Sequence, residues 1–115
     1  MPLLELHTNV NRPENVAAIV EGLSALLAEA TGKPLQYIMV RTSFDEAMAM
    51  GGTTAPAAFL RLSSIGKIGH NENKGYSAKI CKFLTEHLGI EADRVYINFV
   101  DVSRANWGYN GGTFA

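Results

Sequence analysis

The chain shows the same order of predicted elements twice, and this repeat limits the folds open to it. Strand-forming residues over 2–8 precede a helical pattern and a second strand over 37–40. A strand over 57–62 then precedes another helical pattern and a strand over 95–100. Runs of β-branched and aromatic residues bounded by turn residues are typical of strands. The sequence therefore predicts two successive strand–helix–strand units.

Both predicted helices carry a stripe of apolar residues and end at a glycine. Gly32 and Gly89 follow the two stripes directly, where helices commonly end. Pro13 suits the first turn of the first helix. The segments 27–32 and 84–89 share Leu, Glu and Gly at an offset of 57 residues, which favours an ancient duplication. The stripes consist of Val16, Ile19, Val20, Leu23, Leu26, Leu27 and Ala30, and of Tyr76, Ile80, Phe83, Leu84 and Leu88.

Two such βαβ units predict an α+β fold, with a four-stranded sheet and two helices on one face. Right-handed crossovers place both helices on the same side, so the apolar residues on the other face need a cover. No remaining segment is long enough, which makes self-association the simplest solution. Residues 106–115 carry an Asn-Gly turn signal between aromatic residues and are expected to form a short hairpin that docks on a neighbour. Residues 1–115 are expected to form one domain.

Composition and charge exclude several classes of function. The net charge of −1 argues against a general nucleic-acid or anionic-membrane binder. No apolar run approaches the ~20 residues that span a bilayer, and the first residues do not form a secretory signal, so a cytoplasmic location is the default. Cys81 is the single cysteine, which rules out an intramolecular disulfide and a cysteine-based metal site. His7, His70 and His87 show no ligand spacing, and no metal or other cofactor is expected.

Pro2 directly follows Met1, and this pair offers an unusual base. Removal of Met1 would turn the Pro2 nitrogen into a free secondary amine at the chain terminus. An α-amine titrates near ~8 in the reference state, and an apolar pocket or a nearby cation lowers that pKa. A neutral amine of this kind can accept a proton at physiological pH. The alternative is that proline occupies position 2 without any catalytic role.

Several motifs along the chain together resemble the macrophage migration inhibitory factor family of the tautomerase superfamily. The similarity runs essentially from end to end, and its order and spacing are more specific than any one string. The tail is more similar to the inhibitory factor branch than to D-dopachrome tautomerase. The matching residues are Pro2, Thr8-Asn9-Val10, Ala30-Thr31-Gly32-Lys33-Pro34, Gln36-Tyr37-Ile38, Gly51-Gly52, Ser64-Ile65-Gly66-Lys67-Ile68-Gly69, Asp93-Arg94-Val95-Tyr96-Ile97-Asn98 and Thr113-Phe114-Ala115.

The resemblance implies both an assembly and an activity. Three subunits would form a homotrimeric ring around a central channel, with each active site between adjacent subunits. The reaction would be keto–enol tautomerisation of phenylpyruvate-type acids, and of dopachrome as a laboratory substrate. Vertebrate members of the family also act as cytokines and leave the cell without a signal peptide, so a cytoplasmic protein that is also secreted is consistent with the resemblance.

The resemblance also assigns roles to individual residues. Pro2 is the base that moves the proton, and Lys33 binds the substrate carboxylate. From position alone, a solvated lysine near a helix end would be the better interpretation of Lys33, and the resemblance reverses that preference. Ile65 contributes its backbone amide and apolar wall, with Ser64 beside it. Tyr96 and Asn98 are further substrate-binding positions; they share one strand face and would reach the site from the neighbouring subunit. An aromatic rim that would receive the substrate ring consists of Tyr37, Trp107, Tyr109 and Phe114.

Some positions depart from the family pattern or bear on other activities. The family more often has an aliphatic residue at position 107 and tryptophan at position 109, so the pocket is expected to be reshaped. Ala57 and Leu60 occupy the places of a Cys-x-x-Cys pair found in some members, so no thiol–disulfide exchange is expected. Cys81 is expected to be buried and inert.

Two other hypotheses compete with an enzymatic function. Arg12 and Asp45 stand where the family has a receptor-binding pair, although two surface charges are most often only solvated. A cytokine-like protein with a vestigial pocket, acting through a CD74-type or chemokine-type receptor, is therefore the main alternative. A structural oligomer without any ligand is a third reading, which the retained pocket residues disfavour.

Overall fold

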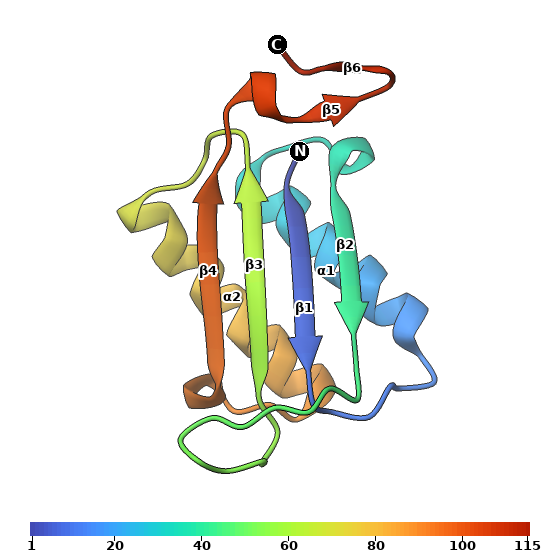
Figure 1. Ribbon diagram of the computed structural model, residues 1–115, viewed down its shortest axis with the longest axis vertical. Coiled ribbons are helices and arrows are strands. Elements are labelled where there is room, and N and C mark those ends of the chain that lie inside the picture. The colour runs from blue at the N-terminus through green and yellow to red at the C-terminus, as the bar shows by residue number, and fades with distance from the viewer.

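The computed structural model describes all 115 residues as a four-stranded sheet, two long helices and a small C-terminal hairpin (Figure 1). Strand order in the sheet is β2–β1–β3–β4. The elements of the sheet and its helices are β1 (Leu3–Thr8), α1 (Val16–Thr31), β2 (Met39–Ser43), β3 (Ala58–Ser64), α2 (His70–Leu88) and β4 (Val95–Asp101). Short 3-10 turns η1 (Leu35–Tyr37), η2 (Ala92–Arg94) and η3 (Arg104–Asn106) precede β2, β4 and the hairpin of β5 (Gly108–Tyr109) and β6 (Gly112–Thr113).

The pairing of the strands confirms the two predicted βαβ units. β1 pairs in parallel with β2, and β3 pairs in parallel with β4, while β1 and β3 join the two halves in antiparallel. Both helices lie behind the sheet, on the same face (Figure 1). The predicted α+β architecture is therefore confirmed.

The core lies between the helices and the sheet face that they cover. β1 and β3 alternate along their length, so that Leu4 and Leu6 point into the core beside Leu60 and Leu62. Both helices contribute one face each, with Ile19, Leu23 and Leu27 from α1 and Tyr76, Ile80 and Leu84 from α2. Each fully buried aliphatic side chain contributes roughly 1.5–3 kcal/mol, so this single layer holds both units together.

The opposite face of the sheet is open, but it is less apolar than the sequence suggested. Cross-strand register aligns Arg41, Glu5, Arg61 and Asn98 in one row across the middle of this face. A guanidinium Nη1 of Arg41 lies 3.9 Å from a carboxylate oxygen of Glu5. Apolar side chains lie on either side of this row, including the exposed Met39 and Tyr96. A cover for this face must therefore satisfy charges as well as bury apolar groups.

Three predicted boundaries were wrong by a few residues. Helix α1 begins at Val16, so Pro13 precedes the helix instead of occupying its first turn. Residues Leu35–Tyr37 form a 3-10 turn, and β2 begins only at Met39, whose amide donates to the Pro2 carbonyl. The turn is needed because the chain must leave α1 and enter β2 in register with β1. The third strand is longer than predicted and runs to Ser64.

The two ends of the sheet carry different connections. At one end, the hairpin turns at Asn110 and Gly111, which both have positive φ values, and this confirms the Asn-Gly signal. At the other end, Arg94 fastens the long loop between β2 and β3 by hydrogen bonds to the carbonyls of Met50, Thr53, Ala55 and Pro56. Neither helix is long and apolar enough to cross a membrane.

Candidate functional site

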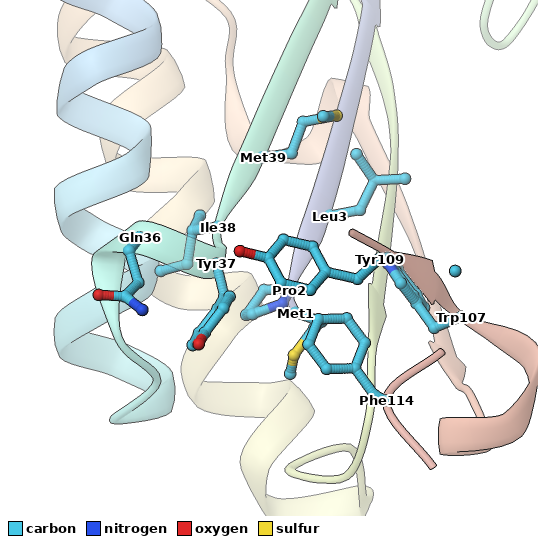
Figure 2. A pocket seen from close by; sticks show the side chains of 11 residues that line it. Met1, Pro2, Leu3, Gln36, Tyr37, Ile38, Met39, Trp107, Tyr109 and Phe114 are labelled. Carbon is cyan, nitrogen blue, oxygen red and sulfur yellow. The ribbon is translucent and has the colours of Figure 1, made fainter. Parts of the chain in front are cut away.

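A cavity of about 410 Å³ opens where β1 begins, between that strand, η1 and the C-terminal hairpin (Figure 2). We call it the Pro2 cavity. Eight of its 11 lining residues are hydrophobic, so a bound ligand would lose much of its water there. The lining consists of Met1, Pro2, Leu3, Gln36, Tyr37, Ile38, Met39, Trp107, Gly108, Tyr109 and Phe114.

Pro2 is fixed at the inner end of this cavity. Its side chain is almost fully buried, and its carbonyl accepts the amide hydrogen of Met39 at 3.0 Å. While Met1 remains attached, the Pro2 nitrogen is a tertiary amide with neither a basic lone pair nor a hydrogen. The terminal α-amine of this chain is therefore that of Met1, and the pKa of this amine is lowered by burial and, to a smaller extent, by the charge of Lys33. A cation and a partly desolvated terminus thus lie close together.

Lys33 reaches the site because α1 ends immediately before it. Gly32 ends the helix in the left-handed conformation with φ of 70°, a geometry that glycine adopts without strain. The Lys33 backbone amide then donates to the hydroxyl of Thr31, and its ammonium donates to the carbonyl of Ile65 at 2.8 Å. Because an ammonium has three donors, two remain for a carboxylate in the cavity.

Aromatic rings form the outer wall of the cavity. Tyr109 and Phe114 stack with ring centroids 5.0 Å apart and planes 11° apart. Tyr37 meets both rings edge-on, at 5.5 Å and 83° to Tyr109 and at 5.8 Å and 90° to Phe114. Figure 2 shows these three rings around the Met1–Pro2 end of the chain, with Trp107 beside them. The arrangement can hold a planar aromatic group against Pro2.

The structure brings some of the predicted site residues together and separates others. Lys33 and Ile65 contact each other beside the Pro2 cavity, whereas Ser64 is completely buried behind its lining. Tyr96 and Asn98 lie on the open face of β4. Tyr96 lines a second cavity of about 300 Å³ near the opposite end of the sheet, which we call the Tyr96 cavity. Within one chain, therefore, Tyr96 does not meet Pro2. The predicted residues that line the Pro2 cavity are Pro2, Tyr37, Trp107, Tyr109 and Phe114.

Sequence reasoning missed part of the lining. Leu3 and Met39 are partners in the β1–β2 register, and they contribute apolar surface beside Pro2. Gln36 lies in the 3-10 turn Leu35–Tyr37, and Ile38 follows that turn, although residues 37–40 were predicted as a strand. The available signal was the position of Met39 two residues after Tyr37, and the structure leaves 62% of its surface exposed.

Other predicted residues lie away from the cavity. The Arg12 amide donates to the Asp45 carboxylate at 3.2 Å, so these residues are neighbours on an exposed surface. Cys81 is only half-buried on α2, not buried as predicted, because it lies beside the inward stripe of that helix. Burial still raises the pKa of its thiol. No group of three or more His, Cys, Asp or Glu side chains is placed to hold a metal ion.

Comparison with known proteins decides the family. The family model of macrophage migration inhibitory factor matches residues 1–115. The chain belongs to this family. It is 48% identical to macrophage migration inhibitory factor of Xenopus tropicalis and 46% identical to that of Rattus norvegicus, each over the full length of both chains. The predicted resemblance is confirmed.

Solved structures agree with the family in their fold. A macrophage migration inhibitory factor homologue from Prochlorococcus marinus matches with a TM-score of 0.95 at 34% identity, over 98% of this chain and 99% of that chain. The inhibitory factor of Trichinella spiralis matches with a TM-score of 0.90 at 36% identity, over 96% and 98%. Family and fold together support the tautomerase superfamily, an isomerase activity in general terms and a cytokine-like protein.

Proposed function

We propose that this protein is a keto–enol tautomerase of phenylpyruvate-type 2-oxo acids, with dopachrome as a second substrate, and that Pro2 is its catalytic base. One observation carries the proposal: Pro2 lies at the inner end of an apolar cavity with the Lys33 charge close to the chain terminus. An amine in such a place titrates below its ordinary range. It can therefore both accept and return a proton near neutral pH.

The cavity offers a group for each requirement of the reaction. Enolisation moves a proton from the benzylic carbon, and the ketone oxygen gains one. Pro2 takes the carbon proton and returns it to the ketone oxygen. Lys33, whose ammonium contacts the Ile65 carbonyl beside the cavity, holds the carboxylate. The aromatic wall formed by Tyr37 and Tyr109 receives the substrate ring. Positioning and a preorganised charge supply the rate, so no cofactor is needed.

The proposed site is completed by a second copy of the chain. Tyr96 and Asn98 are exposed on the open face of β4, with Tyr96 67% exposed, and neither lines the Pro2 cavity of its own chain. A homotrimer in which this face covers a neighbour would supply both residues and bury the uncovered sheet, with the hairpin docked across the interface. Light scattering tests the assembly, because a stable monomer at micromolar concentration would contradict a shared site.

Pro2→Gly is the decisive variant. The assay follows the enol–keto conversion of phenylpyruvate by ultraviolet absorbance, after intact mass has established that Met1 is absent. We expect a loss of about 100-fold or more, since a positioned general base contributes ~10²–10⁴. Pro13→Ala, at a proline outside the cavity, is the matched control. A Pro2→Gly protein as fast as the parent would refute the proposed base.

A second candidate function is cytokine-like signalling through a surface pair. The adjacency of Arg12 and Asp45 favours it, because the Arg12 backbone amide donates to the Asp45 carboxylate and both residues are exposed. Such a role would require the protein to act outside the cell as well as in the cytoplasm. Purified protein should bind a CD74 ectodomain or a chemokine-type receptor, and an Arg12→Ala, Asp45→Ala double variant should bind less. Undetectable binding by the parent protein would exclude this role.

A further inference from the structure

The Ser64 hydroxyl is the one buried side-chain polar atom without a hydrogen-bond partner. Its side chain is completely buried, at the end of β3 and on the side of the sheet that faces the helices. A buried hydroxyl without a partner costs roughly 1–3 kcal/mol, and native structures rarely keep one without a reason. The position of Ser64 suggests which group is its missing partner.

Strand register places Ser64 directly beside Pro2. Leu3 pairs with Ser63, so the next residues, Pro2 and Ser64, oppose each other, and both are buried. The Pro2 carbonyl accepts from Met39 in β2, whereas the Ser64 carbonyl accepts from Val102 beyond β4. The two residues therefore form a pair without mutual backbone hydrogen bonds. Side chains approach most closely in such pairs, with Cα atoms about 4.5 Å apart.

The state of the Pro2 nitrogen explains why the hydroxyl is unpaired. With Met1 attached, this nitrogen has no hydrogen to donate. Once Met1 is removed, the neutral amine carries one hydrogen and the protonated amine carries two. The freed ring then has one covalent link to the rest of the chain, its Cα–C bond, and rotation about this bond would bring its nitrogen toward Ser64. The partner of the hydroxyl thus comes into existence when the chain is processed.

We propose that Ser64 is a positioning residue whose hydroxyl accepts a hydrogen bond from the protonated Pro2 amine during the proton transfer. The inference rests on the proposed role of Pro2 as the base. A hydroxyl can also donate to the neutral amine, but a bond from a charged donor is the stronger of the two. Ser64 therefore favours the protonated form and raises the basicity of Pro2, in opposition to the charge of Lys33.

Several other groups at this end of the sheet could influence the same titration. They are Lys33 after α1, the phenol of Tyr37 in η1, the phenol of Tyr76 in α2, the carboxylate of Asp101 in β4 and the phenol of Tyr109 in β5. The Tyr76 hydroxyl donates to the Lys67 carbonyl at 2.6 Å, and the Asp101 carboxylate accepts from the Gly66 amide at 3.1 Å. Ser64→Ala leaves all five in place, so its effect reports on the hydroxyl alone.

The test measures the pKa of Pro2 directly, by nuclear magnetic resonance titration of labelled proline in protein without Met1 and without substrate. In Ser64→Ala, we expect the pKa of Pro2 to fall by about half to one pH unit, and the acid limb of kcat/KM to move in the same direction. Ser64→Thr should restore both values. Ser63→Ala, one residue away on the open face, should leave them unchanged. An unaltered titration in Ser64→Ala would overturn the proposal.

Thermal stability supplies a second measurement that does not depend on turnover. In a form with an extra N-terminal residue, where the Pro2 nitrogen stays an amide, Ser64→Ala should be neutral or stabilising. In the processed form, at a pH below the pKa of Pro2, the same substitution should lower Tm. An equal effect in both forms would mean that Ser64 is purely structural. An active Pro2→Gly protein would instead refute the proposed function. The hydrogen bond between Ser64 and the Pro2 amine would still be tested separately, by the titration and by the difference in Tm.

Discussion

Each half of the chain starts its first strand at a cavity, yet only the first of these cavities has the chain terminus and a cation beside it. Leu3 pairs with Met39 on the open face of the first half, and Phe59 pairs with Tyr96 in the second. The Pro2 cavity contains the first pair and the Tyr96 cavity contains the second. The buried residue that precedes Leu3 is Pro2, and the buried residue that precedes Phe59 is Ala58.

Two positions account for the difference between the Pro2 cavity and the Tyr96 cavity. Ala58 lies within the chain, so its nitrogen is an amide and can never be a free base, whereas Pro2 can be released as a terminus. The residue after the glycine that ends the helix is Lys33 in the first half but Ile90, which is fully buried, in the second. The second half thus has a cavity in the corresponding place, but it lacks the chain end and the cation on which the proposed site depends.

The largest expected effect comes from giving the second half the missing cation. Ile90→Lys would place an ammonium where the native side chain has no solvent exposure. An unpaired buried charge is among the few causes of very large destabilisation. We expect a loss of about 4 kcal/mol in the free energy of unfolding, measured by urea denaturation. If Ile90→Lys is as stable as the parent, the two ends differ less than their burial indicates.

Removal of the native cation should affect activity rather than folding. Lys33→Met should lower kcat/KM for phenylpyruvate by about 30- to 100-fold, mainly through KM, because a charged hydrogen bond to the carboxylate is lost. The charge of Lys33 lowers the pKa of the nearby terminal amine, so its loss should raise the pKa of Pro2. The acid limb of the pH profile of kcat/KM should then move to higher pH. Lys79→Met on the exposed side of α2 is the control.

The loop beside the Tyr96 cavity depends on Arg94. Arg94→Ala removes four hydrogen bonds to loop carbonyls, and we expect a loss of about 2 kcal/mol in unfolding free energy, since these bonds are partly exposed and not additive. Hydrogen exchange should localise the change to residues 50–56. Arg104→Ala, which removes no hydrogen bond or ion pair, should cost far less. Equal losses for the two variants would contradict the role assigned to Arg94.

The smallest effect is expected at the aromatic wall of the Pro2 cavity. Tyr109→Ala removes one ring from the stack with Phe114 and from the edge contact with Tyr37. Each aromatic pair contributes about 0.5–1.5 kcal/mol, and Tyr109 is half exposed. We expect faster amide exchange in the hairpin and a rise of a few-fold in KM, with little change in global stability. Tyr109→Phe should preserve both properties.

Local patterns predicted most of the fold but not its boundaries. The stripes of α1 and α2, the glycines that end them and the Asn-Gly turn were all readable because they follow from backbone geometry and short-range contacts. The wrong boundaries lie where the chain enters α1 and β2, at Pro13 and at the turn Leu35–Tyr37, and where it leaves β3 at Ser64. At the start of β2, the register imposed by β1 overrides local propensity, and no short segment of sequence contains that register.

The amino-acid sequence by itself determined the two βαβ units and identified Pro2, Lys33 and the aromatic residues of the tail as candidates, since these depend on residue type and order. The resemblance had already grouped the aromatic residues of the tail with Pro2 and Tyr37, but tertiary structure alone decided that Leu3, Gln36, Ile38 and Met39 complete the same cavity. It also decided that Tyr96 lies near the far end of the sheet and that Ser64 opposes Pro2. These placements arise from strand register and packing between distant segments, which sequence spacing does not fix.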